Sequence, residues 1–381
     1  MSITLRRPHS VTDIASGDGH TLTTYARFQD LPLPYRDLFA KVQNGADGHD
    51  FFSTLSWFQH LAETALSQRH RLRIYCVGSG SQRMVLPMCH EVKRNNFFGT
   101  RRLTALANYY TPLFGPVIMP SDNQAAQMLT ALLRSMAGDK PQWDTIDLHP
   151  LDVDSATFAC LLAGFQAASM PMQRYFCFGN WYLDVDGRTY QEYLHGLSSK
   201  LQNTIARKSR TLVDAKRLRI EIVCHEEDIE KSIAAYEDIY LSSWKDGEIF
   251  SAFIPGLIRS CAQQGTLRLG IAYIDDQPAA AQIWIVHHRV ASIFKLAYNE
   301  RFAKLSIGTI LTSKLMQQVI DIDKVREVDY LTGDDAYKKD WMSHRRERWG
   351  IVAFNLRTFR GAISASNHFG RCFIKRLFRA C

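Results

Sequence analysis

Three side chains close together in the sequence could move protons in a transfer reaction. They are Asp329, Asp334 and Tyr337. An amine must lose its ammonium proton before it attacks a carbonyl carbon, and a positioned base accelerates this step by about 10²–10⁴-fold. Asp334 follows Gly333 and precedes Asp335, so a like-charge pair is expected to raise the pKa of one carboxyl. The alternative is a solvated acidic turn that caps a short helix.

A second group of residues could bind a phosphate-bearing donor at the start of a helix. The group consists of Lys304, Ser306, Ile307, Gly308 and Thr309. Backbone N–H groups at a helix start, together with the helix dipole, favour an anion such as a diphosphate, and Lys304 would add a cation. The alternative is an ordinary turn with a serine cap. Further along the chain, Lys338 could bind donor phosphate or the acceptor.

A third group could bind the acceptor. Lys200, Asn203 and Arg207 are three or four residues apart, so they share one face of a helix predicted over 189–215 and could bind an anionic molecule. Tyr109 and Tyr110 are expected to face the same groove from the first half of the chain. The alternatives are a solvated basic helix on the surface and loop aromatics packed on the body.

These groups need a scaffold, and the hydrophobic pattern predicts one. A strand at 290–298 runs into a loop, the loop turns at Gly308 into a helix, and a second strand follows at 327–332. The apolar positions of the helix step by four: Ile307, Leu311, Leu315 and Val319. In such a unit the helix start can hold phosphate while the strand end places polar side chains beside the reacting atoms.

The length of the chain, 381 residues, favours two domains over one. Strands alternate with helices throughout, which predicts an α/β (α+β) fold with a mixed twisted sheet flanked by helices in each domain. The predicted divisions are a mobile N-terminal arm (1–30), a first domain (31–187), a second domain (188–357) and a basic amphipathic tail (358–381).

The net charge of +8 is concentrated in two segments. Residues 200–219 contain seven Lys or Arg against one acid, and residues 357–381 contain six and no acid. Such local basicity predicts anionic partners at these two places. In the tail the cations alternate with apolar residues, which favours either an anionic membrane surface or a final helix that covers the body.

Several functional classes are disfavoured. The N-terminus has no apolar run of the secretory kind, and the longest uncharged stretch, 155–173, is interrupted by Pro171 and is too short for a spanning helix. The eight cysteines show no C-x-x-C spacing, and the histidines show no metal-ligand spacing. The nucleophile elbow of serine hydrolases is missing as well. We therefore expect reduced thiols, no metal and a cytoplasmic protein.

Three strings of residues carry a resemblance to a known family. They are 198–210, which begins Ser-Ser-Lys-Leu-Gln-Asn, then 296–311, and 329–341. The second half resembles an acetyltransferase of the GNAT fold. The span 51–357 resembles the FemAB-like, tandem-GNAT group that includes CelD-type proteins associated with cellulose and exopolysaccharide synthesis. The resemblance implies two GNAT-like domains, the second of which carries the acyltransferase site.

The resemblance also implies roles for individual residues. The strand 290–298 would lie against the acyl-pantetheine arm of acyl-CoA, and backbone groups near Leu296 and Ala297 would polarise the thioester carbonyl, an effect worth roughly 3–4 kcal/mol. Tyr337 would protonate the leaving thiolate. The acyl-CoA signature of GNAT enzymes, Arg/Gln-x-x-Gly-x-Gly/Ala, is only partly present, because the segment 304–309 has one of the two glycines. FemAB relatives use aminoacyl-tRNA instead of acyl-CoA.

Together these features predict an N-acyltransferase that moves an acyl group from acyl-CoA to an amine by direct attack. The acceptor would be a sugar, a glycan or lipid-linked envelope-polysaccharide precursor, or an amino-acid derivative. One alternative is a FemAB-type transfer from aminoacyl-tRNA, with the basic helix on RNA phosphates. Another is a catalytically degenerate scaffold of a polysaccharide-synthesis system. A peripheral place at the inner membrane, through the tail, is a further expectation.

Overall fold

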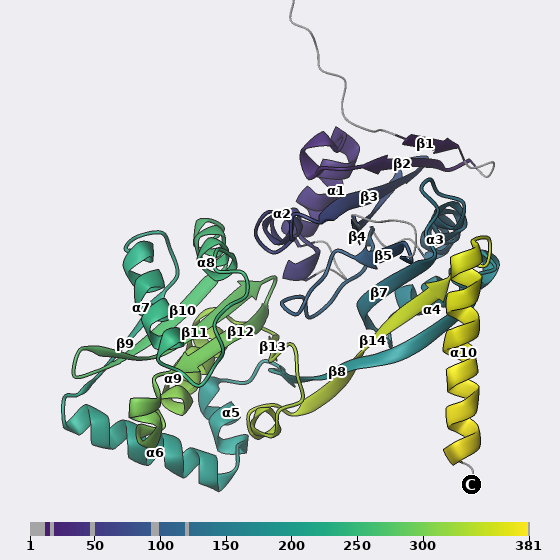
Figure 1. The fold of residues 1–381 in the computed structure, drawn as a ribbon. Coiled ribbons are helices and arrows are strands. Elements are labelled where there is room, and N and C mark those ends of the chain that lie inside the picture. Colours follow the sequence, from purple (N-terminus) through teal and green to yellow (C-terminus); the bar gives the residue numbers. More distant parts are fainter. Residues whose placement is uncertain (1–11, 16–18, 46–49, 93–98, 119–121, 380–381) are drawn as a thin grey trace, which may run out of the picture. The chain divides into compact units, whose positions relative to one another are not determined.

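The computed structural model describes residues 12–15, 19–45, 50–92, 99–118 and 122–379. The chain forms two compact units (Figure 1). The N-terminal unit comprises the described residues up to Cys177 and from Glu347 onward, and the C-terminal unit comprises Phe178–Arg346. These ranges differ from the predicted domains at both ends. The reason is that strands β8 (Met172–Asp184) and β14 (His344–Phe354) each begin in one unit and end in the other.

The sheet of the N-terminal unit has the strand order β1-β2-β3-β4-β5-β7-β14-β8, with the short β6 (Val117–Ile118) paired to β4. The remaining strands are β1 (Thr12–Ala15), β2 (Thr21–Tyr25), β3 (His70–Ser79), β4 (Gln82–Glu91), β5 (Arg102–Ala105) and β7 (Thr145–Asp152). Part of the predicted mobile arm is thus a strand, because β2 pairs with β3 along its whole length and buries Leu22. Residues 1–11 and 16–18 of that arm lie outside the described residues.

The helices of the N-terminal unit are α1 (Leu33–Gln43), α2 (Leu55–Thr64), α3 (Asp122–Ala137), α4 (Ala156–Ala167) and α10 (Phe359–Arg379). Helices α3 and α4 pack closely, since a Cβ at Gly164 would lie 2.7 Å from Leu133 Cδ1. The predicted basic tail corresponds to α10, in which Phe359 and Ile363 are exposed. Its contact with a membrane stays a prediction.

The sheet of the C-terminal unit has the strand order β8-β13-β12-β11-β10-β9. Its strands are β9 (Leu218–Val223), β10 (Leu267–Ile274), β11 (Gln277–His287), β12 (Val290–Tyr298) and β13 (Glu327–Asp329), together with the end of β8. Neighbouring strands are antiparallel except β12 and β13, which are parallel. This mixed sheet with flanking helices agrees with the predicted α/β class.

Five helices belong to this unit: α5 (Tyr190–Gly196), α6 (Ser199–Asp214), α7 (Ile229–Leu241), α8 (Phe253–Gln263) and α9 (Ile307–Gln317). The sequence predicted one long helix over 189–215, but the chain breaks at Leu197. Thr189 begins α5 with a capping box, and the Ser198 side chain begins α6 by accepting a hydrogen bond from Leu201 N. Two caps this close together start two helices.

Helix α9 lies against β10 through the predicted apolar face. Ile307, Leu311 and Leu315 are buried. A Cβ at Gly270 of β10 would lie 2.8 Å from Leu315 Cδ1 and 3.0 Å from Leu311 Cδ1, so the glycine lets the helix approach the sheet. This packing fixes the start of α9 relative to the neighbouring strands.

Candidate functional site

Strands β12 and β13 form a ladder of only three residue pairs. The pairs join Val290–Ser292 to Glu327–Asp329, after which β13 ends and the chain turns at Leu331 (φ 54°) and Gly333 (φ 100°). β12 continues to Tyr298 alongside β11. The backbone of Leu296–Tyr298 therefore lies beyond the end of the parallel ladder, as a place where an extended ligand arm could add to the strand.

A bulge re-aims this end of β12. Two successive residues of β11, Ile283 and Trp284, are opposite Lys295 and Ile293, so β12 carries one extra residue at this point. Bulges bend a strand and are common beside active sites. The predicted carbonyl-binding residues, Leu296 and Ala297, follow the bulge directly, with Leu296 half-buried and Ala297 buried.

The first turn of α9 has no side-chain cap. Ser306 occupies the N-cap position in the left-handed region (φ 55°, ψ 35°), and no side chain accepts a hydrogen bond there. The serine-cap alternative is therefore wrong. Gly308 is half-buried, and a Cβ there would meet only Tyr298 Cδ1, at an ordinary 3.6 Å. The helix start thus lies beside the end of β12, and packing within the protein does not require glycine at this position.

A buried glutamine that sequence reasoning missed holds this turn in place. Gln282 of β11 donates from Nε2 to Gly308 O (3.1 Å) and to Thr312 Oγ1 (2.8 Å). Its Oε1 accepts a hydrogen bond from Trp284 Nε1 at 2.9 Å. Every polar atom of the amide is used, so the residue fixes the carbonyl of Gly308 and leaves the N–H side of the turn to a ligand.

The cations near this turn come from two elements. Lys304 is exposed on the 3₁₀ turn Glu300–Leu305, and Lys208 of α6 donates from Nζ to Lys304 O at 2.8 Å. Sequence reasoning did not select Lys208, because it is close to Lys304 only in the folded chain. Together with the positive end of the α9 dipole, these groups favour an anion at the turn.

Asp329 is not available as a base, which corrects the prediction made from the sequence. It is buried, and its Oδ1 accepts hydrogen bonds from Asn180 Nδ2 (2.5 Å) and Leu331 N (2.6 Å). Its Oδ2 accepts one from Arg346 Nη2 at 2.5 Å. These hydrogen bonds occupy both carboxylate oxygens, and they hold the turn after β13 in place.

Asp334 is also corrected, since the expected rise in its pKa does not occur. Its carboxylate accepts hydrogen bonds from Arg345 Nη2 at 2.8 Å and from Trp181 Nε1 at 2.6 Å. The hydrogen bond from Arg345, followed by that from Trp181, lowers the pKa of Asp334 below its ordinary value. A stabilised carboxylate is a weak base, so Asp334 does not suit the role.

Lys338 is a structural residue rather than a phosphate or acceptor ligand. Only 4% of it is exposed, and its Nζ donates to the carbonyl oxygens of Thr332 (2.5 Å), Gly333 (3.2 Å) and Tyr330 (3.4 Å). The ammonium group thereby closes the acidic turn from inside. A buried charge with this set of partners has no donor left to aim at a ligand.

Tyr337 stays a candidate proton donor. It is 44% exposed, and its ring lies edge-on to Tyr330, with centroids 5.8 Å apart. The hydroxyl of Tyr330 interacts with Thr312 of α9, and Thr312 donates a hydrogen bond to Gly308 O. Tyr330 therefore connects Tyr337 to the first turn of α9. Burial, with the negative charge of Asp335, raises the pKa of Tyr337 to about 12, which keeps its proton in place at neutral pH.

A cluster that the sequence did not reveal covers the same end of β12. Lys295 of β12 pairs with Glu248 at 2.6 Å, both largely buried, and Trp244 packs on Tyr298 with ring centroids 4.5 Å apart. Lys245 lies 5.7 Å from the Trp244 ring. Burial, and then the charge of Lys295, lowers the pKa of Lys245 to about 8. No local motif marks this loop, so only the fold identifies it.

We expect Lys245 to titrate apart from ordinary lysines. In an NMR titration of the protein labelled with ¹³C-lysine, one resonance should move with a midpoint near pH 8. Lys295→Met should raise that midpoint, because it removes a like charge and leaves the Glu248 carboxylate without its cation. Lys231→Met, at an exposed position of α7, is the matched control and should leave it unchanged. A midpoint above pH 10 in the wild type would contradict this interpretation.

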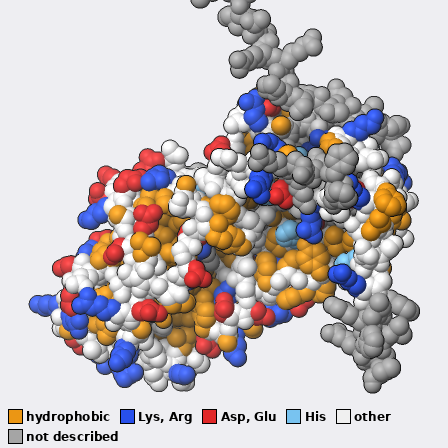
Figure 2. Space-filling view, in the orientation of Figure 1, with side chains coloured by type: hydrophobic (Ala, Val, Ile, Leu, Met, Phe, Trp, Pro, Cys, Tyr) orange, Lys and Arg blue, Asp and Glu red, His pale blue; other side chains and the backbone are white. Residues whose placement is uncertain are grey.

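The predicted acceptor residues lie in two different units. Lys200, Asn203 and Arg207 are exposed on one face of α6 in the C-terminal unit, where Figure 2 shows Lys and Arg side chains along the helix. Tyr109 and Tyr110 belong to the N-terminal unit. Tyr109 is 49% exposed, whereas Tyr110 is 4% exposed and packs against it, so Tyr110 is corrected to a structural aromatic.

Two kinds of feature are absent from the described residues. None of their helices is long and apolar enough to cross a membrane. No group of three or more His, Cys, Asp or Glu among these same residues could hold a metal ion.

Residues 199–339 match the protein family described as the acetyltransferase (GNAT) domain. The matched range contains α6, β12, the turn at Gly308 and the acidic corner with Tyr337. The resemblance seen in the sequence is therefore supported for the second half of the chain. A comparison with curated protein sequences gives no match.

Solved structures share the fold over most of the chain. FemX is 11% identical, with a TM-score of 0.59, and the alignment covers 85% of this chain and 97% of that one. L-PGS from Bacillus licheniformis is 11% identical (TM-score 0.52; 89% and 97% covered). The C-terminal domain of a putative lysylphosphatidylglycerol synthetase from Agrobacterium fabrum is 10% identical (TM-score 0.50; 83% and 91% covered). These identities concern the fold alone, and the predicted fold class is confirmed.

Proposed function

We propose that the C-terminal unit transfers an acyl group from acyl-CoA to an amine. The observation that carries the proposal is the junction of β12 and α9, where an uncapped helix start, Gly308 and the backbone of Leu296–Tyr298 meet beyond the end of the β13 ladder. The diphosphate would take the N–H groups at the start of α9, with Lys304 and Lys208 nearby. The acyl-pantetheine arm would extend along β12, with Leu296 and Ala297 at the thioester.

The reaction needs two proton transfers. The amine nitrogen attacks the thioester carbonyl carbon, the carbon–sulfur bond breaks, and no covalent enzyme intermediate forms. Tyr337, still protonated at neutral pH, would give its proton to the leaving thiolate. The neutral form of Lys245 would accept the proton that the amine loses, a role that a lysine with a pKa near 8 suits. The acceptor would be a sugar amine, an envelope-polysaccharide precursor or an amino-acid derivative.

The donor can be tested directly by calorimetry with acetyl-CoA. Binding is expected, and acetyl-CoA at 100 times its dissociation constant should stabilise the fold by about 2.7 kcal/mol. Dephospho-CoA and free pantetheine, which lack parts of the anionic moiety, should bind progressively more weakly. Absence of binding for acetyl-CoA and for longer acyl-CoA species would contradict the proposal.

We expect Tyr337→Phe to lower kcat by about 10²-fold or more without raising KM for acetyl-CoA, because only the proton donor is lost. The measurement is release of the free CoA thiol with an amine acceptor. The wild-type rate should rise as the pH passes about 8, since deprotonation of Lys245 produces the base. Tyr273→Phe, a tyrosine of β10 outside the site, is the control. Wild-type turnover in Tyr337→Phe would remove this residue from the mechanism.

A second candidate is a FemAB-type transfer from aminoacyl-tRNA. The observation that favours it is the exposed basic face of α6, with Lys200 and Arg207. A tRNA complex should weaken steeply with salt, because bound phosphates release counterions. Salt-sensitive binding of tRNA together with no binding of any acyl-CoA would favour this candidate. Absence of both would favour a scaffold role in polysaccharide synthesis.

A further inference from the structure

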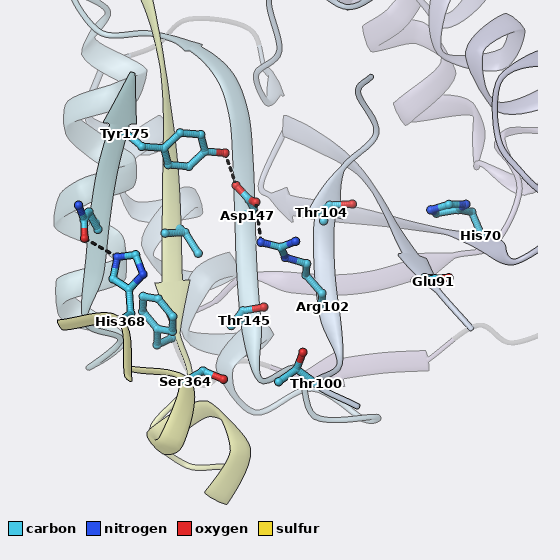
Figure 3. Close-up of a pocket in the computed structure, with 13 residues that line it drawn as sticks. His70, Glu91, Thr100, Arg102, Thr104, Thr145, Asp147, Tyr175, Ser364 and His368 are labelled. Atoms are coloured by element: carbon cyan, nitrogen blue, oxygen red, sulfur yellow. Dashed lines mark hydrogen bonds and ion pairs between the residues drawn. The ribbon is translucent and has the colours of Figure 1, made fainter. Parts of the chain in front are cut away.

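The N-terminal unit contains a polar cleft that the proposed acyl transfer does not use. Its volume is about 840 Å³, within the range of small-molecule sites. Figure 3 shows its side chains projecting from β5, β7, β8 and β14, with His368 and Ser364 contributed by α10. The residues that define its chemistry are Arg102, Thr104, Asp147, Tyr175, Phe354 and His368.

The cleft occupies one face of the sheet, and the alternation of each strand explains why it is polar. Thr145 and Asp147 of β7 line it, whereas the intervening Ile146 and the following Leu148 are fully buried on the other face. β7 lies between β5 and β14 in the interior of the sheet. An interior strand that presents a carboxylate to a concave space is typical of a binding face, because desolvating a charge is costly for the fold alone.

Asp147 is held in place at the centre of the cleft. Its Oδ1 accepts a hydrogen bond from Tyr175 Oη at 2.6 Å and lies 3.3 Å from His149 Nδ1, and its Oδ2 lies 3.6 Å from Arg102 Nη2. Burial alone would raise the pKa of Asp147, but the hydrogen bonds from His149 and Tyr175 and the charge of Arg102 outweigh it, so the pKa is lowered. The carboxylate is therefore ionised and only 9% exposed.

The rest of the lining supplies mixed donors and acceptors over an apolar floor. Arg102 keeps 61% of its side chain exposed, and His368 contacts Gln173 through Nε2. Val352 and Phe354 of β14 give an apolar surface. Among the described residues of the lining, Arg102 is the one arginine or lysine, and it stands against two acids, Asp147 and Glu91. A phosphate-rich ligand would meet the guanidinium group of Arg102 alone among these described residues, together with two carboxylates.

We propose that this cleft binds a neutral saccharide. The lining contains carboxylates, which accept hydrogen bonds, a guanidinium group, which donates them, and threonine hydroxyls, which do both. A sugar hydroxyl both donates and accepts, so it can pair with each of these groups. The apolar face of a sugar ring would cover Val352 and Phe354. The proposal concerns binding by the N-terminal unit and holds whether or not the C-terminal unit uses acyl-CoA.

The test uses the full-length protein and three neutral disaccharides, namely cellobiose, maltose and N,N′-diacetylchitobiose. Saturation-transfer NMR should detect binding of at least one of them, and calorimetry should give its affinity. Arg102→Gln, at a side chain that is 61% exposed, should weaken binding by about 10-fold. Asp147→Asn should weaken it further and serves as the second variant.

Arg174→Gln is the matched control. Arg174 lies on β8 between Gln173 and Tyr175, so its exposed side chain projects from the opposite face of the same sheet. This variant should bind the disaccharide as the wild type does. Failure of all three disaccharides to bind the folded wild type would overturn the proposal. Binding that neither cleft variant weakens, or inorganic phosphate displacing the sugar from the wild type, would overturn it as well.

Discussion

Replacing Gly308 with alanine is expected to abolish acetyl-CoA binding while the protein remains as stable as the wild type. A Cβ at this position meets only Tyr298 Cδ1 at 3.6 Å, so the fold accommodates it, and alanine favours a helix by up to about 1 kcal/mol over glycine. A donor diphosphate, by contrast, must approach the N–H groups of this turn closely, and a methyl group would occupy that approach.

The measurement pairs unfolding with ligand binding. The melting temperature of Gly308→Ala without ligand should equal or exceed that of the wild type, and addition of acetyl-CoA should no longer raise it. Gly196→Ala is the control, because it adds the same methyl group elsewhere in the unit. Gly196 is the last residue of α5, and a Cβ there would contact nothing within 4 Å. Undiminished binding by Gly308→Ala would show that the donor does not lie at the start of α9.

Replacing Arg346 with methionine is expected to destabilise the C-terminal unit by about 3–5 kcal/mol. Arg346 donates from Nη2 to Asp329 Oδ2 (2.5 Å) and to Glu327 Oε1 (2.6 Å), and from Nε to Asn180 Oδ1 (2.6 Å). Its guanidinium also stacks on the Tyr182 ring at 4.3 Å. Methionine fills much of the space but leaves the buried carboxylate of Asp329 without a cation.

The neighbouring residue offers a control with the same chemistry. Arg345 pairs with Asp334 at 2.8 Å, but their side chains are 31% and 44% exposed. Solvent screens such a pair, so Arg345→Met should destabilise the protein far less than Arg346→Met. Urea-induced unfolding followed by circular dichroism measures both variants. Equal losses would mean that burial does not distinguish the two ion pairs.

Sequence pattern predicted the scaffold well because the scaffold depends on short-range signals. Strand β12 and the buried face of α9 follow from local periodicity, and the GNAT-like half was visible in three strings of residues. The break between α5 and α6 was missed, although Thr189 and Ser198 both carry cap chemistry. Helical periodicity on both sides concealed the two starts.

The acidic corner was harder to predict, because its chemistry depends on partners distant in the chain. Besides Arg346 and Arg345, Asn180 and Trp181 donate hydrogen bonds to Asp329 and Asp334, about 150 residues later in the chain, and no local motif signals these distant donors. Gln282 and Lys245 were missed for the same reason. Tyr337 was selected on the strength of the family resemblance, and its role stays a proposal.

The position of β14 has a consequence for how the chain is made. β14 lies between β7 and β8 in the sheet of the N-terminal unit, yet most of it, from Glu347 to Phe354, is synthesised only after the whole of Phe178–Arg346. During synthesis on the ribosome, the sheet of the N-terminal unit therefore lacks its strand between β7 and β8, while all the strands of the C-terminal unit have already been made. A nascent chain arrested before Glu347 should expose the edges of β7 and β8 to chaperones and proteases, although most of its residues have been translated.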